Sequence, residues 1–561
     1  IWPQCDILNN NNMRTYKYLI VTIIMGLSFT SCNDFLDPDP TDRLSEKLFW
    51  QNEESTDLYL NSFYPYLSSY GNFGTSQFNN GLLTEGMTDM LKYGSYSAGV
   101  GNANRIVFNP YFVTADQSQG LVIWTTSYER IRRVNEFLSS MSKYSTYNED
   151  TNKRYEAQIR FIRAFLYYQL LLRTNTVIIY DKLPDGNSKP LSPESDCWDF
   201  VEQDLDYAIQ NLPVQWDATR SGRITKGAAL AMKSRAMLVA RRWEKARTAA
   251  SEVINLQDNG SLVYELNKDY KNAFKSYFDN GNKESILEFR YKLPAPYHSF
   301  DRDFAPGGDW ANNGGSACPT QEMVEEYELA TGGKADWSKW HSKTTETPPY
   351  SLLEPRFHAS VLYNGASWKN RKIETFVDGK DGYIDYGFQA NTNGKTTTGY
   401  YLRKYLDESI ADISTTYSAQ PWIEIRLAEV YLNLAEACAM LGSTYDKDAN
   451  NAIRTIRERV KLPYTDLTGE ELMKAIRHER KVELAYEGFY YWDLRRWRMA
   501  DSILDGARFH GLKITQSGTT LTYEYIDCDK EDRKFPERFY NFPIPTTEIA
   551  NNLAISQINL W

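Results

Sequence analysis

The sequence predicts a mainly α-helical fold in which helical hairpins stack into a superhelix, with an irregular, loop-rich second lobe that carries short strands. Three observations support this fold class. Apolar residues recur at helical spacing between residues 156 and 256, and they do so again between residues 427 and 460. The stretch from residue 256 to about residue 420 is rich in Gly, Asn, Tyr, Trp and Pro and has no long helical stripe.

The first 45 residues are expected to serve secretion and anchoring rather than the fold. Residues 1–12 form an upstream extension, and residues 13–31 have the positive start and short apolar stretch that are typical of a signal peptide. The small residues before Cys32 resemble a bacterial lipobox, in which the cysteine thiol carries a diacylglycerol; the alternative is an ordinary signal peptide with a chance cysteine. Because several acyl chains hold a protein on a membrane far more firmly than one, lipidation predicts a permanent anchor. Residues 32–45 carry Asp and Pro and are expected to form a polar tether.

Residues 46–255 are expected to form the N-terminal helical part. Ile159, Ile162, Leu166 and Leu170 lie on one stripe, and aromatic residues widen that stripe, which implies packing on more than one side. Further helices are predicted at residues 195–211, 225–240 and 243–256.

Residues 256–420 are expected to form the second lobe and to carry the ligand-binding surface. A strand-like piece occurs at residues 285–291. A stretch of this length would be unusual as one structureless loop, so we expect it to pack as a lobe on the helices. Loops held on a rigid scaffold commonly carry binding residues.

Residues 421–561 are expected to form a second, C-terminal helical part. Apolar residues from Leu427 to Leu441 step by four and three, and a similar stripe follows at residues 449–460. In architecture rather than in repeat consensus, these pairs resemble tetratricopeptide hairpins of about 35 to 40 residues. Each hairpin needs a neighbour to cover its apolar face, which predicts one stacked superhelix. Cys438 lies on the first stripe and is expected to be a buried free thiol.

Composition excludes several classes of partner and site. The net charge is −10 and no basic block occurs, so a nucleic-acid partner is not expected. No CxxC pair is present, which excludes a zinc ribbon or a thioredoxin-like site. No cofactor or metal site is expected, and bound calcium is left open. Aromatic residues make up 14% of the chain, an abundance that suits wet binding surfaces.

Catalytic residues are not expected. Glu479 and Glu483 lie four residues apart on one helix face. Glycosidase carboxylates flank a sugar from two sides, at about 5 to 9.5 Å. The basic residues around this pair instead favour ion pairs that clamp the last helices together. His478 and Glu479 begin an HExxH pattern, but Val482 stands at the second histidine position, and no GxSxG elbow is present.

The candidate ligand-binding residues lie in two aromatic loop segments. For a sugar, the ligand class that the family resemblance described below implies, flat rings suit the CH face, while amides and carboxylates bind the hydroxyl groups. The alternative for each ring is that it fills a contact between the lobes. Trp310 is the best single candidate. The full set is Tyr93 and Tyr96 in the first segment, and Tyr297, Asp309, Trp310 and Asn313 in the second, Gly-rich segment.

Several segments together resemble the SusD/RagB family of outer-membrane nutrient-binding lipoproteins, in the order that this family has. The most specific is ERKVELAYEG at residues 479–488, followed by WDLRRW at residues 492–497. Phe489 and Tyr490 depart from the family, which commonly has a basic residue there. Further matches are RFIRAFLYY at residues 160–168, GRITKGAA at 222–229, RLAEVYLNLAEA at 426–437 and FPIP at 542–545.

The resemblance implies a non-enzymatic protein anchored in the outer membrane and exposed at the cell surface. It also implies a SusC-like TonB-dependent transporter as partner, to which the protein would deliver bound oligosaccharide or polysaccharide. Peptides or glycopeptides are the alternative cargo on the same fold, and a surface glycoside hydrolase is the remote alternative.

Overall fold

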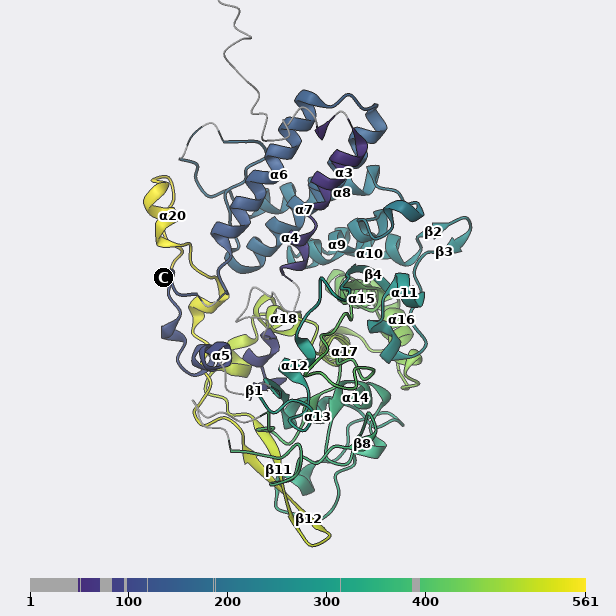
Figure 1. Cartoon of the computed structure of the whole chain (residues 1–561), viewed down its shortest axis with the longest axis vertical. Helices are drawn as coiled ribbons and strands as arrows, with labels where there is room; N and C mark the ends of the chain where they lie inside the picture. The colour runs from purple at the N-terminus through teal and green to yellow at the C-terminus, as the bar shows by residue number, and fades with distance from the viewer. Residues whose placement is uncertain are drawn as a thin grey trace, which may run out of the picture.

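The computed structural model describes residues 49–50, 52–70, 83–94, 98–118, 120–184, 186, 188–312, 314–385 and 394–561. Most long helices gather in its upper half, and many loops lie in the lower half with strands β1, β8, β11 and β12 (Figure 1). One large cluster of buried apolar side chains extends from Trp50 to Ile555, so the two halves share a continuous core.

Paired helices build the N-terminal part. Helix α7 begins where the side chain of Asn148 accepts a hydrogen bond from Thr151 N, with Glu149 and Asp150 in the first turn, an arrangement that favours a helix start. Helix α9 begins at Thr225, whose hydroxyl accepts from Ala228 N. The helices are α3 (Glu53–Asn61), α4 (Pro65–Ser68), α5 (Ala98–Phe108), α6 (Trp124–Tyr144), α7 (Glu149–Thr174), α8 (Glu194–Asn211), α9 (Lys226–Val239) and α10 (Trp243–Ile254).

The C-terminal part continues the same stack. Helix α15 ends at Gly442, whose φ of 103° is a conformation that side-chain-bearing residues rarely adopt. A β-hairpin, β11 with β12, extends from the far end of the molecule in Figure 1. The elements are α15 (Leu427–Leu441), α16 (Asp446–Arg459), α17 (Gly469–Glu483), α18 (Tyr490–Arg496), α19 (Ala500–Leu504), β11 (His510–Ser517), β12 (Thr520–Asp527) and α20 (Thr546–Asn551).

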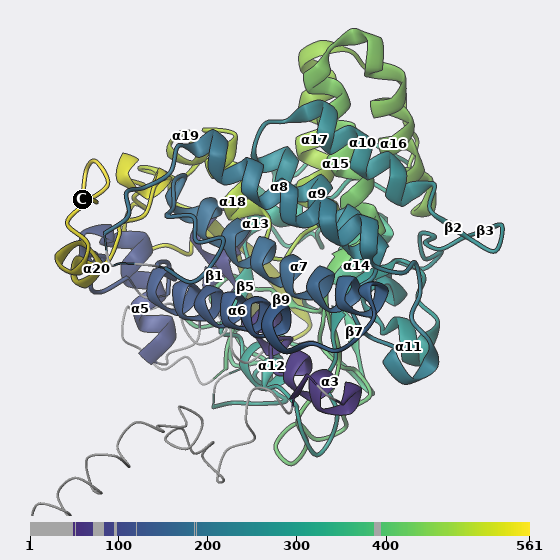
Figure 2. The same cartoon turned by 90° about the horizontal axis from the view of Figure 1, so that it is seen from above.

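The helices form one stack although the second lobe interrupts them in sequence. Helix α7 packs on α8, α8 on α9, and α9 on α10; α10 then packs directly on α15, and α15 on α16. Figure 2 shows this succession from above. The stack confirms the predicted superhelix of helical hairpins, and the helices predicted at residues 195–211, 225–240 and 243–256 occur within a few residues of those bounds.

The chain enters the second lobe and returns to the helical stack through one pair of strands. Strand β4 pairs antiparallel with β10, so the chain enters and leaves the lobe side by side. Short elements form along the chain between these two strands, and β2, β3 and α11 precede β4. The elements of this region and its partner strand are β1 (Leu91–Tyr93), β2 (Gln257–Asp258), β3 (Ser261–Leu262), α11 (Tyr277–Asn280), β4 (Ser285–Phe289), α12 (Phe300–Phe304), β5 (Ala317–Pro319), α13 (Gln321–Glu326), α14 (Pro355–Ser360), β6 (Val361–Leu362), β7 (Ser367–Trp368), β8 (Arg371–Lys372), β9 (Tyr401–Leu402) and β10 (Trp422–Arg426).

Two further features follow from the described residues. Among them, no helix has the length and apolar character needed to cross a membrane. Cys197, Cys318, Cys438 and Cys528 are all buried free thiols, as expected for Cys438.

Candidate functional site

A short backbone pairing places two aromatic loops of the second lobe side by side. His298 N donates to Ser418 O at 3.0 Å, and Ser418 N donates to His298 O at 3.2 Å. The imidazole lies beneath this pairing, with Nε2 2.9 Å from Gln420 O and Nδ1 3.3 Å from Phe300 N. Burial lowers the pKa of His298 to about 4, so the ring is neutral near pH 7. The pairing brings Tyr297, which precedes His298, next to Tyr417.

Four side chains form a row on this part of the surface, which we call the aromatic row: Tyr297, Tyr417, Arg302 and Trp310. The rings of Tyr297 and Tyr417 stack with centroids 4.2 Å apart and planes 28° from parallel. The Arg302 guanidinium lies 3.7 Å from the centroid of Tyr417 and 5.4 Å from that of Trp310. Tyr297 is 46% exposed, whereas Tyr417 and Trp310 are partly buried.

Backbone contacts fix this row in place. Arg302, in α12, donates from Nε to Ile413 O at 2.7 Å and from Nη2 to Ser414 O at 3.0 Å. Its charged group therefore bridges α12 and the loop that carries Tyr417. A cation beside an aromatic face adds attraction to both rings, and the rigid guanidinium orders them. The row is thus largely preformed, as expected of a site that binds by stacking.

A closed loop holds Trp310 at one end of the row. Trp310 N donates to Pro306 O at 3.2 Å, and Gly315 N donates to Ala305 O at 2.9 Å. Gly314 permits this closure, because an added Cβ would lie 2.5 Å from Trp310 O. The indole packs on Ala305, Ile410 and Ile413. Its Nε1 is buried and has no hydrogen-bond acceptor among the described residues.

Asp309, next to Trp310, has its carboxylate occupied by protein groups. It accepts from Trp368 Nε1 at 2.6 Å and from Arg371 Nη2 at 2.9 Å, and Lys369 Nζ lies 3.2 Å away. Burial raises the pKa of Asp309, but the hydrogen bonds from Trp368 and Arg371 outweigh burial and lower it below its ordinary value. Asp309 therefore orders the turn beneath Trp310 and has little capacity left for a ligand hydroxyl.

The described start of the first predicted segment, strand β1, lies close to the second segment in space, but Tyr93 does not reach its surface. Strand β1 pairs with β5, which places Tyr93 opposite Ala317, just beyond the loop of Trp310. Tyr93 itself is only 1% exposed, and its hydroxyl donates to Leu83 O at 2.8 Å. Its ring fills the core, which is the alternative that the sequence left open. Tyr96 and Asn313 lie outside the described residues.

Sequence reasoning missed Tyr417 and Arg302. Tyr417 lies 120 positions after Tyr297 and becomes its neighbour only through the pairing of His298 with Ser418. Residues around Tyr417 show no Gly-rich or multi-aromatic pattern that would mark a binding loop. Arg302 is one charged residue in a short helix, and only its contacts distinguish it from a solvated arginine.

Glu479 and Glu483 are enclosed in a buried network of ion pairs. Glu483 accepts from Arg426 at 2.7 Å and from Arg356 at 3.1 Å, and it also pairs with Arg459. Glu479 accepts from Arg457 at 3.1 Å and also pairs with Arg356. Both carboxylates are buried and saturated by arginines from other elements, so this pair cannot flank a sugar. No cluster of His, Cys, Asp and Glu suited to a metal ion occurs in the part of the chain that the structure describes.

Comparisons with known proteins match nearly the whole chain. A family model described as the SusD family matches residues 241–561, and a model described as "Starch-binding associating with outer membrane" matches residues 34–238. A SusD-like protein of Bacteroides ovatus is 25% identical over 506 residues, which cover 85% of this chain and 82% of that protein. A crystal structure of a SusD-like protein from Bacteroides fragilis is 27% identical with a TM-score of 0.74, covering 91% of this chain and 98% of that one. A laminarin-binding SusD-like protein shares the fold at 21% identity and a TM-score of 0.61, covering 91% of this chain and 100% of that one.

Proposed function

The chain belongs to the SusD/RagB family, and from this premise we propose that it is a cell-surface lipoprotein that binds a glycan and delivers it to a SusC-like TonB-dependent transporter. The aromatic row carries the proposal. Tyr297, which is 46% exposed, offers an aromatic surface on which a sugar can stack, and Arg302 holds Tyr417 and Trp310 in place behind it. Two structural relatives are described as binding carbohydrate or laminarin, which supports a glycan as the ligand.

The shape of the row bears on how a glycan would bind. Tyr297 is exposed, while Trp310 is supported from beneath by apolar side chains. A sugar ring would stack on the exposed ring of Tyr297, and the exposed residues Asn312 and Ser414 lie in the two loops that carry the row, where they could make polar contacts. The net charge of −10 favours a neutral glycan over a strongly anionic one, because an acidic protein repels anions at long range.

Incubating the purified chain with a panel of neutral glycans tests this function. We expect binding without product, and we expect Tyr297→Ala and Trp310→Ala each to weaken it by about 1–3 kcal/mol, the range for loss of an aromatic stacking contact. Isothermal titration calorimetry gives the affinities. Tyr111→Ala is the matched control, because Tyr111 is an exposed tyrosine that contacts Arg538 instead of the row.

Other outcomes of the same experiment decide against the proposal. Cleavage of any glycan would show that the protein is a hydrolase instead of a non-enzymatic binding protein. Retention of peptides with no glycan bound would favour the peptide-binding alternative. Unchanged affinity in both ring variants would remove the row from the site, even if a glycan bound elsewhere.

The membrane anchor is a separate part of the proposal, and Cys32 lies outside the described residues. Labelled palmitate should be incorporated into the wild-type chain in a bacterial host and not into Cys32→Ala, and only the wild type should fractionate with membranes. The buried Cys197→Ala is the control. Equal labelling of Cys32→Ala would show that another group carries the lipid.

A further inference from the structure

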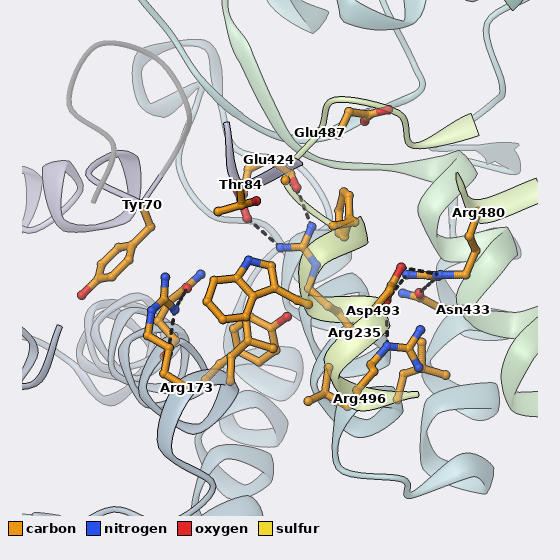
Figure 3. Close-up of a pocket in the computed structure, with 18 of the residues that line it drawn as sticks. Tyr70, Thr84, Arg173, Arg235, Glu424, Asn433, Arg480, Glu487, Asp493 and Arg496 are labelled. Atoms are coloured by element: carbon orange, nitrogen blue, oxygen red, sulfur yellow. Dashed lines mark hydrogen bonds and ion pairs between the residues drawn. The ribbon is translucent and has the colours of Figure 1, made fainter. Parts of the chain in front are cut away.

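A small cavity lies between the helical stack and the C-terminal helices, away from the loops of the aromatic row. It is bounded by α7, α9, α15, α17 and α18 and has a volume of about 90 Å³. One water needs about 10–15 Å³ of such space, so the cavity has room for a small group and a few waters but not for a sugar chain. Figure 3 shows Tyr70 and Arg173 on one side of it and Arg480, Asp493 and Arg496 on the other.

Most of the charges around this cavity are paired. Arg235 donates to Glu429 and Glu424, at 2.6 Å in each case. Across the cavity, Asp493 accepts from Arg480 at 3.1 Å and from Arg496 at 2.7 Å. Arg480 and Arg496 are matched by Asp493 and Glu436, and Arg235 faces two carboxylates, so none of these three arginines presents an unpaired charge to the cavity.

Arg173 is different. It lies in the last turn of α7 and is 7% exposed; among the residues that the structure describes, it donates only from Nη1, to the backbone oxygen and to Oε1 of Gln169, both at 2.9 Å. Within the described residues its Nε has no acceptor, and its guanidinium pairs with no carboxylate. The edge formed by Nε and Nη2 is the side of a guanidinium that receives an oxyanion with two parallel hydrogen bonds.

A second buried arginine makes the region still more positive. Arg173 lies 4.5 Å from the ring of Trp492, and Arg495 lies 4.9 Å from the same ring. Arg495 donates to backbone oxygens only, those of Phe539, Leu172 and Tyr540 among them. Burial, with the neighbouring Arg495 contributing, lowers the pKa of Arg173 to about 10. A buried charge without an opposite charge beside it is destabilising, and a bound anion offsets that penalty.

We propose that this cavity binds a small oxyanion, a carboxylate or a tetrahedral sulfate or phosphate group, with Arg173 as its anchor. The unpaired edge of the guanidinium supplies the donors, and the Trp492 indole orients it. Tyr70 and Thr84 also line the cavity, with the Tyr70 hydroxyl 2.8 Å from Ser127 Oγ. Such a site is independent of the proposed binding of a neutral glycan to the aromatic row.

Isothermal titration calorimetry at constant ionic strength in chloride tests the site with sulfate, phosphate, acetate and glucuronate. We expect one equivalent of at least one of these to bind the wild type, and Arg173→Gln to bind it at least tenfold more weakly. The inorganic ions and glucuronate separate a free anion from an acidic sugar as its source. Arg132→Gln is the matched control, because the Arg132 side chain is 71% exposed and should leave affinity unchanged.

A second variant and a second measurement distinguish a loss of anion binding from a loss of folding. Arg173→Lys keeps the charge but loses the two-donor edge, so we expect a native circular dichroism spectrum with weakened binding. Sulfate stabilises most proteins through exclusion from the surface, and that general increase in Tm should be equal in all variants. The additional, saturable increase should occur in the wild type and in Arg132→Gln only. No saturable binding to the wild type, or wild-type affinity in Arg173→Gln, would overturn the proposal, whatever the result for neutral glycans.

Discussion

At the scale of single residues, Glu483 is the side chain on which the C-terminal part depends most. It is fully buried and pairs with Arg356, Arg426 and Arg459, which come from three different elements. The pKa of Glu483 is well below its ordinary value because these arginines outweigh the effect of burial. The attraction between Glu483 and its arginines adds little net stability, because burying the charges is unfavourable. Removing the carboxylate is strongly destabilising, because it leaves buried arginines unpaired.

We therefore expect Glu483→Ala to reduce the free energy of unfolding by about 3–5 kcal/mol, the range for removal of one partner from a buried ion pair. Urea denaturation followed by circular dichroism measures this change. Glu471→Ala on the same helix is the control; its side chain is 68% exposed and pairs with Lys474, so the expected loss is about 0.5 kcal/mol or less. An equally small loss in Glu483→Ala would show that the network does not clamp these elements.

The candidate binding residues could be predicted only in part from the sequence. Trp310 and Tyr297 were predicted from an aromatic, Gly-rich loop, and the structure places both in one row. Tyr93 has the same composition around it, yet its ring is in the core. Composition shows which segments are rich in aromatic side chains. Whether the Tyr93 ring is exposed depends instead on the pairing of its strand with residues more than 200 positions away. Local sequence carries no record of that pairing.

At the scale of elements, the junction between the short 3₁₀ helix η2 (Thr84–Met87) and the turn after α17 contains a buried acid. Glu85 Oε1 accepts from Gly488 N at 2.6 Å. Burial, with Glu487 contributing, raises the pKa of Glu85 from 4.5 to about 7. The folded protein therefore holds a proton that the unfolded chain has released above about pH 4.5. The stabilisation from Glu85 is complete below that pH and is lost as pH rises through about 7.

Replacing Glu85 with Gln should remove this part of the pH dependence. We expect the free energy of unfolding of Glu85→Gln to fall less between pH 5 and pH 8 than that of the wild type, by up to about 3 kcal/mol, with the variant the more stable one at pH 8. Denaturant titrations at several pH values give the two curves. Glu252→Gln, at an exposed position in α10, should parallel the wild type. Parallel curves for Glu85→Gln would contradict the assignment.

Element boundaries were predictable where helical periodicity is strong. The helix predicted at residues 195–211 occurs as α8 (Glu194–Asn211), and the one predicted at 243–256 occurs as α10 (Trp243–Ile254). In the second lobe the strand at 285–291 was the only element predicted, and it occurs as β4 (Ser285–Phe289). The remaining elements there have two to six residues each, too short for a hydrophobic period to repeat.

At the scale of the whole molecule, paired carboxylates make stability depend on pH at the acidic end. Burial raises the pKa of Glu436, but Arg496 and Arg480 outweigh it and lower that pKa to about 2. The pKa of Glu328 is likewise lowered to about 2, against burial, by Arg457. Because these folded-state values lie below those of the unfolded chain, the stabilisation is present above about pH 4.5 and is lost as pH falls through about 2.

We expect the free energy of unfolding to fall steeply between pH 4.5 and pH 2, with each such group contributing on the order of 3 kcal/mol. Thermal denaturation across this range measures the effect. Glu436→Gln should be less stable than the wild type at pH 7 and should lose less on acidification. A wild-type Tm that stays constant down to pH 2 would show that these pairs are not formed in solution.

The pairing of β4 with β10 allows the lobe between these strands to change in length and sequence while the helices stay in place. Because the chain departs from the helices and rejoins them through adjacent antiparallel strands, the two ends of the lobe keep a fixed spacing whatever its length. Lengthening a closed loop is only weakly unfavourable, at about 0.6 kcal/mol for each doubling. Insertions between the strands can thus reshape the proposed glycan-binding loops while α10 remains packed on α15, so a different ligand can be accommodated without rebuilding the helical stack.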